Sequence, residues 1–521
     1  MKTALVFSVV CLLAVLSALW AAPLWQRTYN GQSNRDDEVH AIGTDDSGNV
    51  VVSGFSDLSS TDAEFVTIKY KPNGDTAWLR HFNPGNGLDG ATSLAIDRRG
   101  NVIVDGYIGG STSGYGDWAV VKYSAAGDSL WTATWNLGAN DRPIQIVVDT
   151  AGNSYVTGNA GSQNYMDFAV VKFDASGNKV WQFIYDGGDN DGAAAVAVDF
   201  AGNVYATGYT VLGGNYGHLL TMKLNPAGDS LWKNIYTGPA GKTDMGSYIV
   251  VDGSGNVIVS GVSNDTAGRS DYITIKYSSN GDTLWTRRYN GPGNQADVPL
   301  GLVLDAAGNA YVTGCSYDVN NHYDYGTIKY SPDGAERWVA RYPGASHQAG
   351  ATAIGLDADA NVYVTGTSLS ASYFWGVATV KYDSAGDQRW AESYAGDSGE
   401  TEAYVLAVGS SSSVYVGARM GVSNEGMDYL TLNYGAAGAV METPNAKVRT
   451  THAATIARGI LFLPAPTFTL HSSLFSLSGQ KVLDLNPGAN DVSSLSPGVY
   501  FVRAAGGKLS AMNCHKVVIQ K

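Results

Sequence analysis

A short element related to Gly-Asn-Val-Tyr-Val-Thr-Gly recurs eight times along this chain of 521 residues. Successive copies are 50 to 53 residues apart, and the asparagine position is occupied in turn by Asn49, Asn101, Asn153, Asn203, Asn256, Asn309, Asn361 and Ser413. Such even spacing means that each copy belongs to one structural unit that packs against its neighbours. A repeat architecture therefore accounts for the length of the chain better than one ordinary compact domain does.

Each unit is predicted to contain four short β-strands. In one unit the β-rich, apolar segments cover residues 247–251, 256–260, 271–277 and 283–289, and Gly, Asn and Asp turns separate them. No segment after the first 22 residues shows the 3.6-residue period of an amphipathic helix. One four-stranded meander in every 40–50 residues is typical of a β-propeller blade.

The tryptophans predict how the ring of blades closes. They recur at Trp25, Trp78, Trp131, Trp181, Trp232, Trp285, Trp338 and Trp390, so the first precedes the first Gly-Asn element and the last unit has none. The N-terminus thus has a spare fourth strand, and the last unit lacks one. We expect residues 24–29 (LWQRTY) to complete the last blade, because a shared strand removes the open edges of the sheets. The count is eight blades.

The repeat resembles the SBBP-type propeller repeats of bacterial secreted proteins, and this resemblance covers roughly residues 23–441. The matching pattern is A-x-D-x-x-G-N-x-Y-V-T-G followed by T-I-K-Y-x-x-x-G-D-x-L-W. The spacing from Gly281 to Trp285 is also similar to the docking motif of quinoprotein propellers. These resemblances imply that residues 247–251 line a central channel and that each Trp stacks on the next blade. The SBBP family description implies seven blades, the alternative to our count.

Both ends of the chain depart from the repeat. Residues 1–21 have a basic start, an apolar run and small residues near a cleavage point, which is typical of a secretory signal peptide. The propeller is expected over residues 22–441, a linker over 442–446 and a small Ig-like β-sandwich over 447–521. The pieces LSGQKV (477–482) and LSPGVY (495–500) resemble the C-terminal sorting domains of type IX (Por) secretion. That resemblance implies the secretion machinery as a partner.

Six aspartates form a series that precedes the predicted inner strands. They are Asp37, Asp89, Asp141, Asp191, Asp244 and Asp297, and Ala349 and Thr401 occupy the position in the last two units. Rotation about the channel would place the six carboxylates in a ring at one mouth, where a hard cation such as Ca²⁺ would offset their repulsion. The alternative is that each Asp caps its own loop. A second series, at Asp45, Asp97, Asp149, Asp199, Asp252, Asp305 and Asp357, is expected to build Asp-x-x-Gly turns.

The sequence favours a binding protein over an enzyme. It contains no His-Glu-x-x-His, Gly-x-Ser-x-Gly or phosphate-loop motif. A net charge of −14 disfavours nucleic acid as a partner. We expect a noncatalytic scaffold, secreted or on the outer surface of a bacterium, that binds a glycan or protein ligand and has no transmembrane span after signal cleavage. The alternatives are a secreted polysaccharide hydrolase or lyase and an envelope assembly scaffold. Apart from Ca²⁺, no cofactor is expected.

Overall fold

The computed structural model describes residues 23–435, apart from residues 86, 111–115, 137, 139–140, 162–164, 371–372, 397–399 and 423–425. Beyond residue 435 it describes only the seven strands of the tail. The chain divides into two compact units, Met1–Met441 and Glu442–Lys521, which are treated separately below. The signal peptide expected over residues 1–21 and the linker expected over 442–446 lie outside the described residues.

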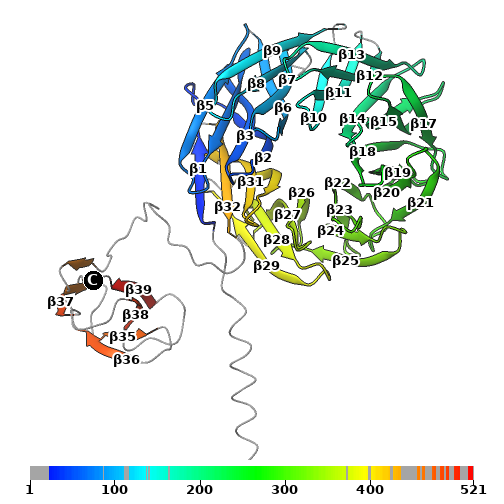
Figure 1. Ribbon diagram of the computed structural model, residues 1–521. Helices are drawn as coiled ribbons and strands as arrows, with labels where there is room; N and C mark the ends of the chain where they lie inside the picture. The colour runs from blue at the N-terminus through cyan, green and yellow to red at the C-terminus, as the bar shows by residue number, and fades with distance from the viewer. Residues whose placement is uncertain are drawn as a thin grey trace, which may run out of the picture. The chain divides into compact units, whose positions relative to one another are not determined.

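The first unit is a ring of antiparallel blades around a central space (Figure 1). Blade 1 is β2 (Asp37–Thr44), β3 (Val50–Ser59), β4 (Asp62–Tyr70) and β5 (Thr76–Phe82). Blade 2 is β6 (Leu88–Ile96), β7 (Val102–Gly110), β8 (Asp117–Tyr123) and β9 (Ser129–Trp135). Blade 3 is β10 (Arg142–Val148), β11 (Ser154–Gly161), β12 (Met166–Phe173) and β13 (Lys179–Tyr185). Blade 4 is β14 (Asp191–Val198), β15 (Val204–Val211), β16 (Gly217–Leu224) and β17 (Ser230–Tyr236).

The second half of the ring repeats this pattern. Blade 5 is β18 (Asp244–Val251), β19 (Val257–Asn264), β20 (Ser270–Tyr277) and β21 (Thr283–Tyr289). Blade 6 is β22 (Val298–Leu304), β23 (Ala310–Tyr317), β24 (Tyr323–Tyr330) and β25 (Glu336–Tyr342). Blade 7 is β26 (Ala349–Leu356), β27 (Val362–Leu369), β28 (Trp375–Tyr382) and β29 (Gln388–Tyr394). Blade 8 is β30 (Thr401–Val408), β31 (Val414–Val422), β32 (Gly426–Tyr434) and the N-terminal β1 (Trp25–Tyr29).

The N-terminal strand closes the ring, as the tryptophan count predicted. β1 pairs antiparallel with β32, with Trp25 opposite Asn433 and Tyr29 opposite Tyr429. The strand order of that sheet is β1-β32-β31-β30, so the two ends of the propeller meet in one blade. Each blade has four strands, and the eight-bladed propeller is confirmed. Seven blades, the number that the SBBP description implies, is not the number in this chain.

The core lies between neighbouring blades. One cluster joins Trp118 and Trp135 of blade 2 to Ile146 and Phe173 of blade 3, and similar clusters recur around the ring. The second and third strands of blade 5 are buried almost throughout, whereas most residues of its fourth strand are exposed or half-buried. The faces of the blades therefore supply the apolar surface that holds the ring together.

Each outer tryptophan docks on the next blade. Trp232 of blade 4 lies between Tyr205 of its own blade and Tyr277 of blade 5, with ring centroids 6.3 and 6.1 Å away. Its indole nitrogen donates to the Ser279 carbonyl at 3.2 Å. Gly281 follows in the same turn at a φ of +94°, and a Cβ there would lie 3.0 Å from the indole ring. Trp25 makes the equivalent bond, 2.9 Å to a carbonyl of blade 1, across the closure.

The tail unit contains two small sheets. The first has the order β33-β34-β37 and consists of β33 (Thr455–Ala457), β34 (Ile460–Leu463) and β37 (Gly488–Asp491). The second has the order β36-β35-β38-β39 and consists of β35 (Ser472–Ser476), β36 (Lys481–Leu485), β38 (Gly498–Ala504) and β39 (Cys514–Ile519). Within the described residues of the whole chain, no helix is long and apolar enough to cross a membrane.

Candidate functional site on the loop face

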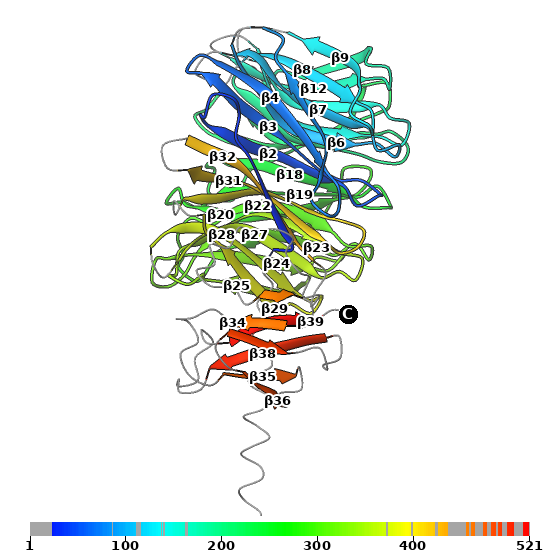
Figure 2. The same cartoon turned by 90° about the vertical axis from the view of Figure 1, so that its left-hand side faces the viewer.

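The two ends of the propeller differ in chemistry because different connections meet there (Figure 2). At one end each first strand turns into the second, and each third strand turns into the fourth; we call this end the turn face. At the other end lie the connections from second to third strand and from each blade to the next; we call this end the loop face. Turns on the turn face are short and similar, whereas connections on the loop face differ in length and residues.

The second aspartate series builds the turn face, as predicted. In blade 5, Asp252 Oδ1 accepts the backbone N–H groups of Ser254 and Asn256 at 2.9 Å, and Oδ2 accepts the Asn256 amide at 2.9 Å. Lys276 from the third strand lies 3.1 Å from the same carboxylate. Burial alone would raise the pKa of Asp252, but these hydrogen bonds outweigh it and hold the pKa below its ordinary value. The backbone hydrogen bonds recur in the other six turns of the series, and the lysine pairing recurs at Asp45 and Asp97.

The first series lies at the loop face, where each aspartate is buried in its own blade. Asp297 accepts two backbone N–H groups. Gly291, in the connection that enters the blade, donates at 2.5 Å, and Tyr317, at the end of the second strand, donates at 3.0 Å. The others accept backbone N–H groups from one or both of these places. In blade 8 the neutral hydroxyl of Thr401 takes over this role and accepts the N–H of Gly396 at 3.0 Å. The series is therefore a set of loop clamps.

The structure does not bring these six carboxylates together into a cation ring. Each is 0–1% exposed and turned toward backbone amides of its own loop. Among the described residues, no group of potential metal ligands combines two members of Asp37, Asp89, Asp141, Asp191, Asp244 and Asp297. The expectation of a ring rested on rotational symmetry alone, whereas the hydrogen bonds hold each side chain against the backbone of its own blade. Burial raises the pKa of Asp89 to about 6, since a single backbone bond offsets the desolvation only in part.

The central channel is lined by one bulge residue from every first strand. A shift in strand register places an extra residue on each of these strands, which directs its side chain inward. The residues are His40, Thr92, Ile144, Ala194, Ser247, Leu300, Thr352 and Tyr404, and all eight line a cavity of about 630 Å³. The wall mixes apolar and polar side chains, and two of them, His40 and Tyr404, lie at the blade 8–blade 1 junction.

That junction holds an ion-pair cluster. Arg419 pairs with Glu38 of blade 1 and lies 2.8 Å from Glu402 of its own blade, while the Tyr404 hydroxyl donates to Glu402 at 3.1 Å. His40 lies 3.4 Å from Glu38. Burial would raise the pKa of Glu38, but the bond from His40 and the charge of Arg419 hold it below its ordinary value. Because these charges satisfy one another, the cluster stabilises the closure of the ring.

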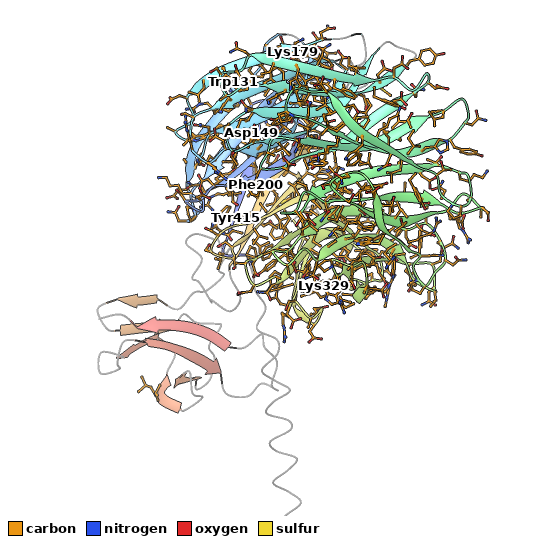
Figure 3. The ribbon with its side chains drawn as sticks, turned by 45° about the vertical axis from the view of Figure 1, so that its right-hand side comes forward. Trp131, Asp149, Lys179, Phe200, Lys329 and Tyr415 are labelled. Carbon is orange, nitrogen blue, oxygen red and sulfur yellow. The ribbon has the colours of Figure 1, made fainter. Side chains whose placement is uncertain are left out.

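The turn face has a cavity of its own. It measures about 560 Å³ and is lined by turn residues of blades 3, 4 and 5, among them Asp149 and Phe200 (Figure 3). Phe200 is 84% exposed at its edge. The carboxylates Asp149 and Asp199 in its wall already accept the hydrogen bonds of their own turns.

Exposed aromatic side chains gather on the loop face. Among the described residues, every exposed aromatic side chain except Phe200 lies in a connection from a second to a third strand or at the start of a third strand: Tyr165, Tyr216, Tyr323, Tyr373, Phe374 and Trp375. Tyr373, Phe374 and Trp375 are consecutive and are 79, 53 and 40% exposed. Isolated exposed apolar residues are ordinary, but a group of them on one face marks an interaction site.

The richest part of this face is the blade 6–7 patch, which comprises residues 318–323, 343–348, 370 and 373–375. Two of its loops are tied together, because Ser346 Oγ donates to the Ser370 carbonyl at 2.6 Å and Leu369 N to the Gln348 carbonyl at 2.8 Å. Asp318, His322 and His347 converge at its edge, with the two imidazole centroids 5.7 Å apart. The sequence did not indicate this convergence, since His347 belongs to a different loop from the other two.

The comparisons with known proteins support the fold. No protein-family model matches the chain. An uncharacterised WD repeat-containing protein of Acanthamoeba polyphaga mimivirus is 22% identical over 435 residues, which cover 68% of this chain and 31% of that protein. The chain thus spans about a third of the length of this curated relative.

Two solved structures of Sqt1 from Chaetomium thermophilum are similar in fold. The first has a TM-score of 0.54 at 12% identity and covers 81% of this chain and 98% of Sqt1. The second, with the same score and identity, covers 78% of this chain and 98% of Sqt1, which is bound there to the N-terminus of a ribosomal protein. Together with the eight blades and their strand order, these likenesses show that residues 23–435 form a repeat-built β-propeller.

Proposed function

We propose that the chain is a secreted or cell-surface propeller scaffold that binds a glycan or protein ligand through its loop face and catalyses no reaction. The observation that carries this proposal is the gathering of exposed aromatic side chains in the loops of that face. Aromatic side chains bring large contact area at low entropic cost, and they dominate the binding energy of many interfaces.

The geometry of the patch also supports binding. The aromatic run at residues 373–375 lies on a loop that is hydrogen-bonded to its neighbour, so it is held in place before any ligand arrives. Preorganised contact residues lose less conformational entropy on binding. Sqt1, which shares the propeller fold, is bound to a segment of another protein in one of its structures. By fold analogy, a protein ligand is one of the two ligand classes to test.

The location and the tail belong to the same proposal. We infer from the SBBP-type repeat and the signal peptide that the chain is exported by a bacterium, and from the motifs at 477–482 and 495–500 that residues 447–521 are a type IX sorting domain. Expression with and without this tail, in a bacterium that has the pathway, tests the role. We expect surface display only with the tail, and equal display of both forms would contradict a sorting role.

Ligand binding and catalysis are separated by one set of measurements on the mature protein. A glycan array and an array of outer-surface proteins are probed for binding, and soluble polysaccharides are incubated with the protein and assayed for new reducing ends or unsaturated products. We expect binding on one of the two arrays and no product. Turnover of a polysaccharide would favour the hydrolase or lyase alternative. Binding confined to envelope proteins of the same bacterium would favour the assembly scaffold.

A further inference from the structure

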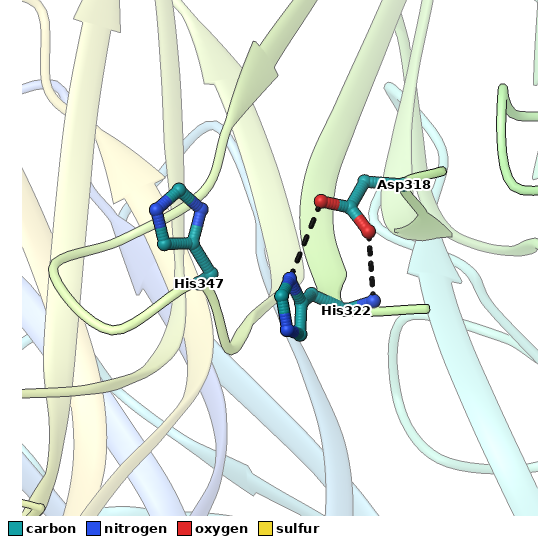
Figure 4. A group of neighbouring side chains, drawn as sticks. All are labelled: Asp318, His322 and His347. Carbon is teal, nitrogen blue, oxygen red and sulfur yellow. Dashed lines mark hydrogen bonds and ion pairs between the residues drawn. The ribbon is translucent and has the colours of Figure 1, made fainter. Parts of the chain in front are cut away.

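Asp318, His322 and His347 form a cluster of potential metal ligands at the edge of the blade 6–7 patch (Figure 4). One ligand atom from each of the three side chains lies within 4.8 Å of the other two. Asp318 and His322 come from the loop between β23 and β24, and His347 comes from the connection between β25 and β26. The fold brings these two loops together although the residues lie up to 29 positions apart in the sequence.

The distance between Asp318 and His322 suits a shared cation. Nδ1 of His322 lies 3.4 Å from Oδ2 of Asp318, which is longer than a good hydrogen bond. This nitrogen is shielded from solvent and makes no hydrogen bond within the described part of the chain. Two ligands at 2.0–2.2 Å from a tetrahedral zinc ion are about 3.3–3.6 Å apart. A metal ion between the two atoms would therefore need little movement of either.

The carboxylate is already oriented for such a role. Oδ1 of Asp318 accepts the backbone N–H groups of Asn320 and His322, each at 2.8 Å. Oδ2 faces the imidazole of His322 and also accepts the side-chain amide of Asn320 at 3.4 Å. Asn321 lies in the tight turn between Asp318 and His322, with a φ of +65°.

The second histidine is also fixed in place by its loop. His347 has a φ of +53°, in the left-handed region that few non-glycine residues adopt, although Asn, Asp and His do so several-fold more often than the others. The neighbouring Ser346 donates to the Ser370 carbonyl and so anchors the loop to blade 7. Backbone conformations of this kind persist where the surrounding structure holds them, and they cluster at binding sites.

We propose that Asp318, His322 and His347 bind a divalent metal ion of the zinc class. Two imidazole nitrogens with one carboxylate favour Zn²⁺ and its transition-metal neighbours, whereas Ca²⁺ and Mg²⁺ take oxygen ligands. The ion joins the blade 6 loop to the blade 6–7 connection and stabilises this edge of the loop face. Three protein ligands leave a coordination position for water or for an acidic group of a bound partner. This metal site goes beyond the proposed function, because metal binding by these three side chains does not require that a glycan or protein is bound to the loop face.

Metal titration of the full chain, without an affinity tag and stripped with a chelator, tests the proposal. Calorimetry with ZnCl₂ is expected to give one site per chain, with no comparable binding of CaCl₂, and zinc is expected to raise the melting temperature. Co²⁺ in place of zinc should show the absorption of a tetrahedral site.

Variants in the exposed loops identify the ligands. Loss of a residue that only supports a metal ligand weakens metal binding by about 10–100-fold. His322→Gln combined with His347→Asn removes two ligands, so it should weaken zinc binding by more than this and should remove the thermal shift. Asn at 347 keeps the left-handed backbone accessible. Asp318→Asn should weaken binding as well, while His218→Ala, on blade 4, serves as the matched control and should leave it unchanged. Zinc affinity that is absent in the parent chain, or equal in the parent and the double variant, would overturn the assignment.

Discussion

At the residue scale, a few side chains per repeat do most of the positioning. The turn aspartates organise the turn face, the clamp aspartates fix the loop connections, and the outer tryptophans join each blade to the next. The glycines in the turns from third to fourth strand are part of this last contact. A Cβ on Gly281, for example, would lie only 3.0 Å from the indole ring of Trp232 in the preceding blade. Gly281 combines this close approach with a φ of +94°, so two independent costs oppose any side chain there.

Gly281→Ala is predicted to reduce the free energy of unfolding by about 1–3 kcal/mol, because the new methyl group meets Trp232 and the backbone becomes strained. Gly253→Ala in the same blade is the matched control: a Cβ there has no heavy atom within 4 Å, and its φ lies outside the left-handed region. Urea unfolding followed by tryptophan fluorescence measures both. Equal stability of the two variants would show that the docking contact contributes little.

The carboxyl groups predict a pH dependence with two opposite parts. Burial raises the pKa of Asp89 to about 6, so the folded state binds this proton more tightly and the free energy of unfolding rises as the pH falls from 7 to 5. The turn aspartates have lowered pKa values, so the stability they contribute is complete above the ordinary value of 3.8 and is lost as the pH falls below it.

Urea midpoints at pH 7, 5 and 3 test this account, and the value at pH 5 should be the highest. In Asp89→Asn the rise from pH 7 to pH 5 should shrink, because the titrating group is gone. Stability that increases steadily from pH 3 to pH 7 would contradict the raised pKa of the clamp.

At the element scale, the N-terminal strand decides whether the ring is closed. Deletion of residues 23–30 should remove β1, expose the edge of β32 and leave the blade 1 turn without Trp25, which is 7% exposed. Truncation of a buried tryptophan alone costs about 3–5 kcal/mol, and the open edge promotes association. Trp131→Ala, at a half-buried docking position away from the closure, is the control and should lose stability while it stays monomeric.

Melting curves and light scattering distinguish these outcomes. A deletion variant that melts like the parent and remains monomeric would contradict closure by β1.

The elements also show where sequence reasoning succeeds and where it fails. The eight blades and the closing strand were predictable because the repeat spacing and the tryptophan offset encode them locally. The metal-ligand cluster was not, since His322 and His347 meet only through the packing of two irregular loops. For the first aspartate series, symmetry predicted that the six residues lie at one end of the ring but could not predict that each carboxylate is bonded within its own blade. Similarly, no local pattern indicated that Lys276 pairs with Asp252 of its own blade.

At the scale of the whole molecule, near-identical blades form a stiff ring, and the variation is concentrated on the loop face. A repeat array gains stability from neighbour contacts, so its outer loops can change without loss of the fold. The aromatic run at residues 373–375 and the cluster around His322 both lie on blades 6 and 7. We therefore propose that the ligand binds to this part of the surface and that the outer edges of the blades have a structural role.

The most direct test compares binding by two surface variants, each of which replaces two exposed apolar side chains with serine. Tyr373→Ser with Phe374→Ser alters the loop face, whereas Leu231→Ser with Leu284→Ser alters the outer strands, where the two leucines are 53 and 52% exposed. Both are titrated against every glycan or protein that the parent binds on the arrays. The account predicts that the loop-face variant loses at least about 10-fold in affinity, the size of a modest hot spot, while the outer-strand variant binds like the parent. Equal binding by the two variants, or a loss confined to the outer-strand variant, would contradict it.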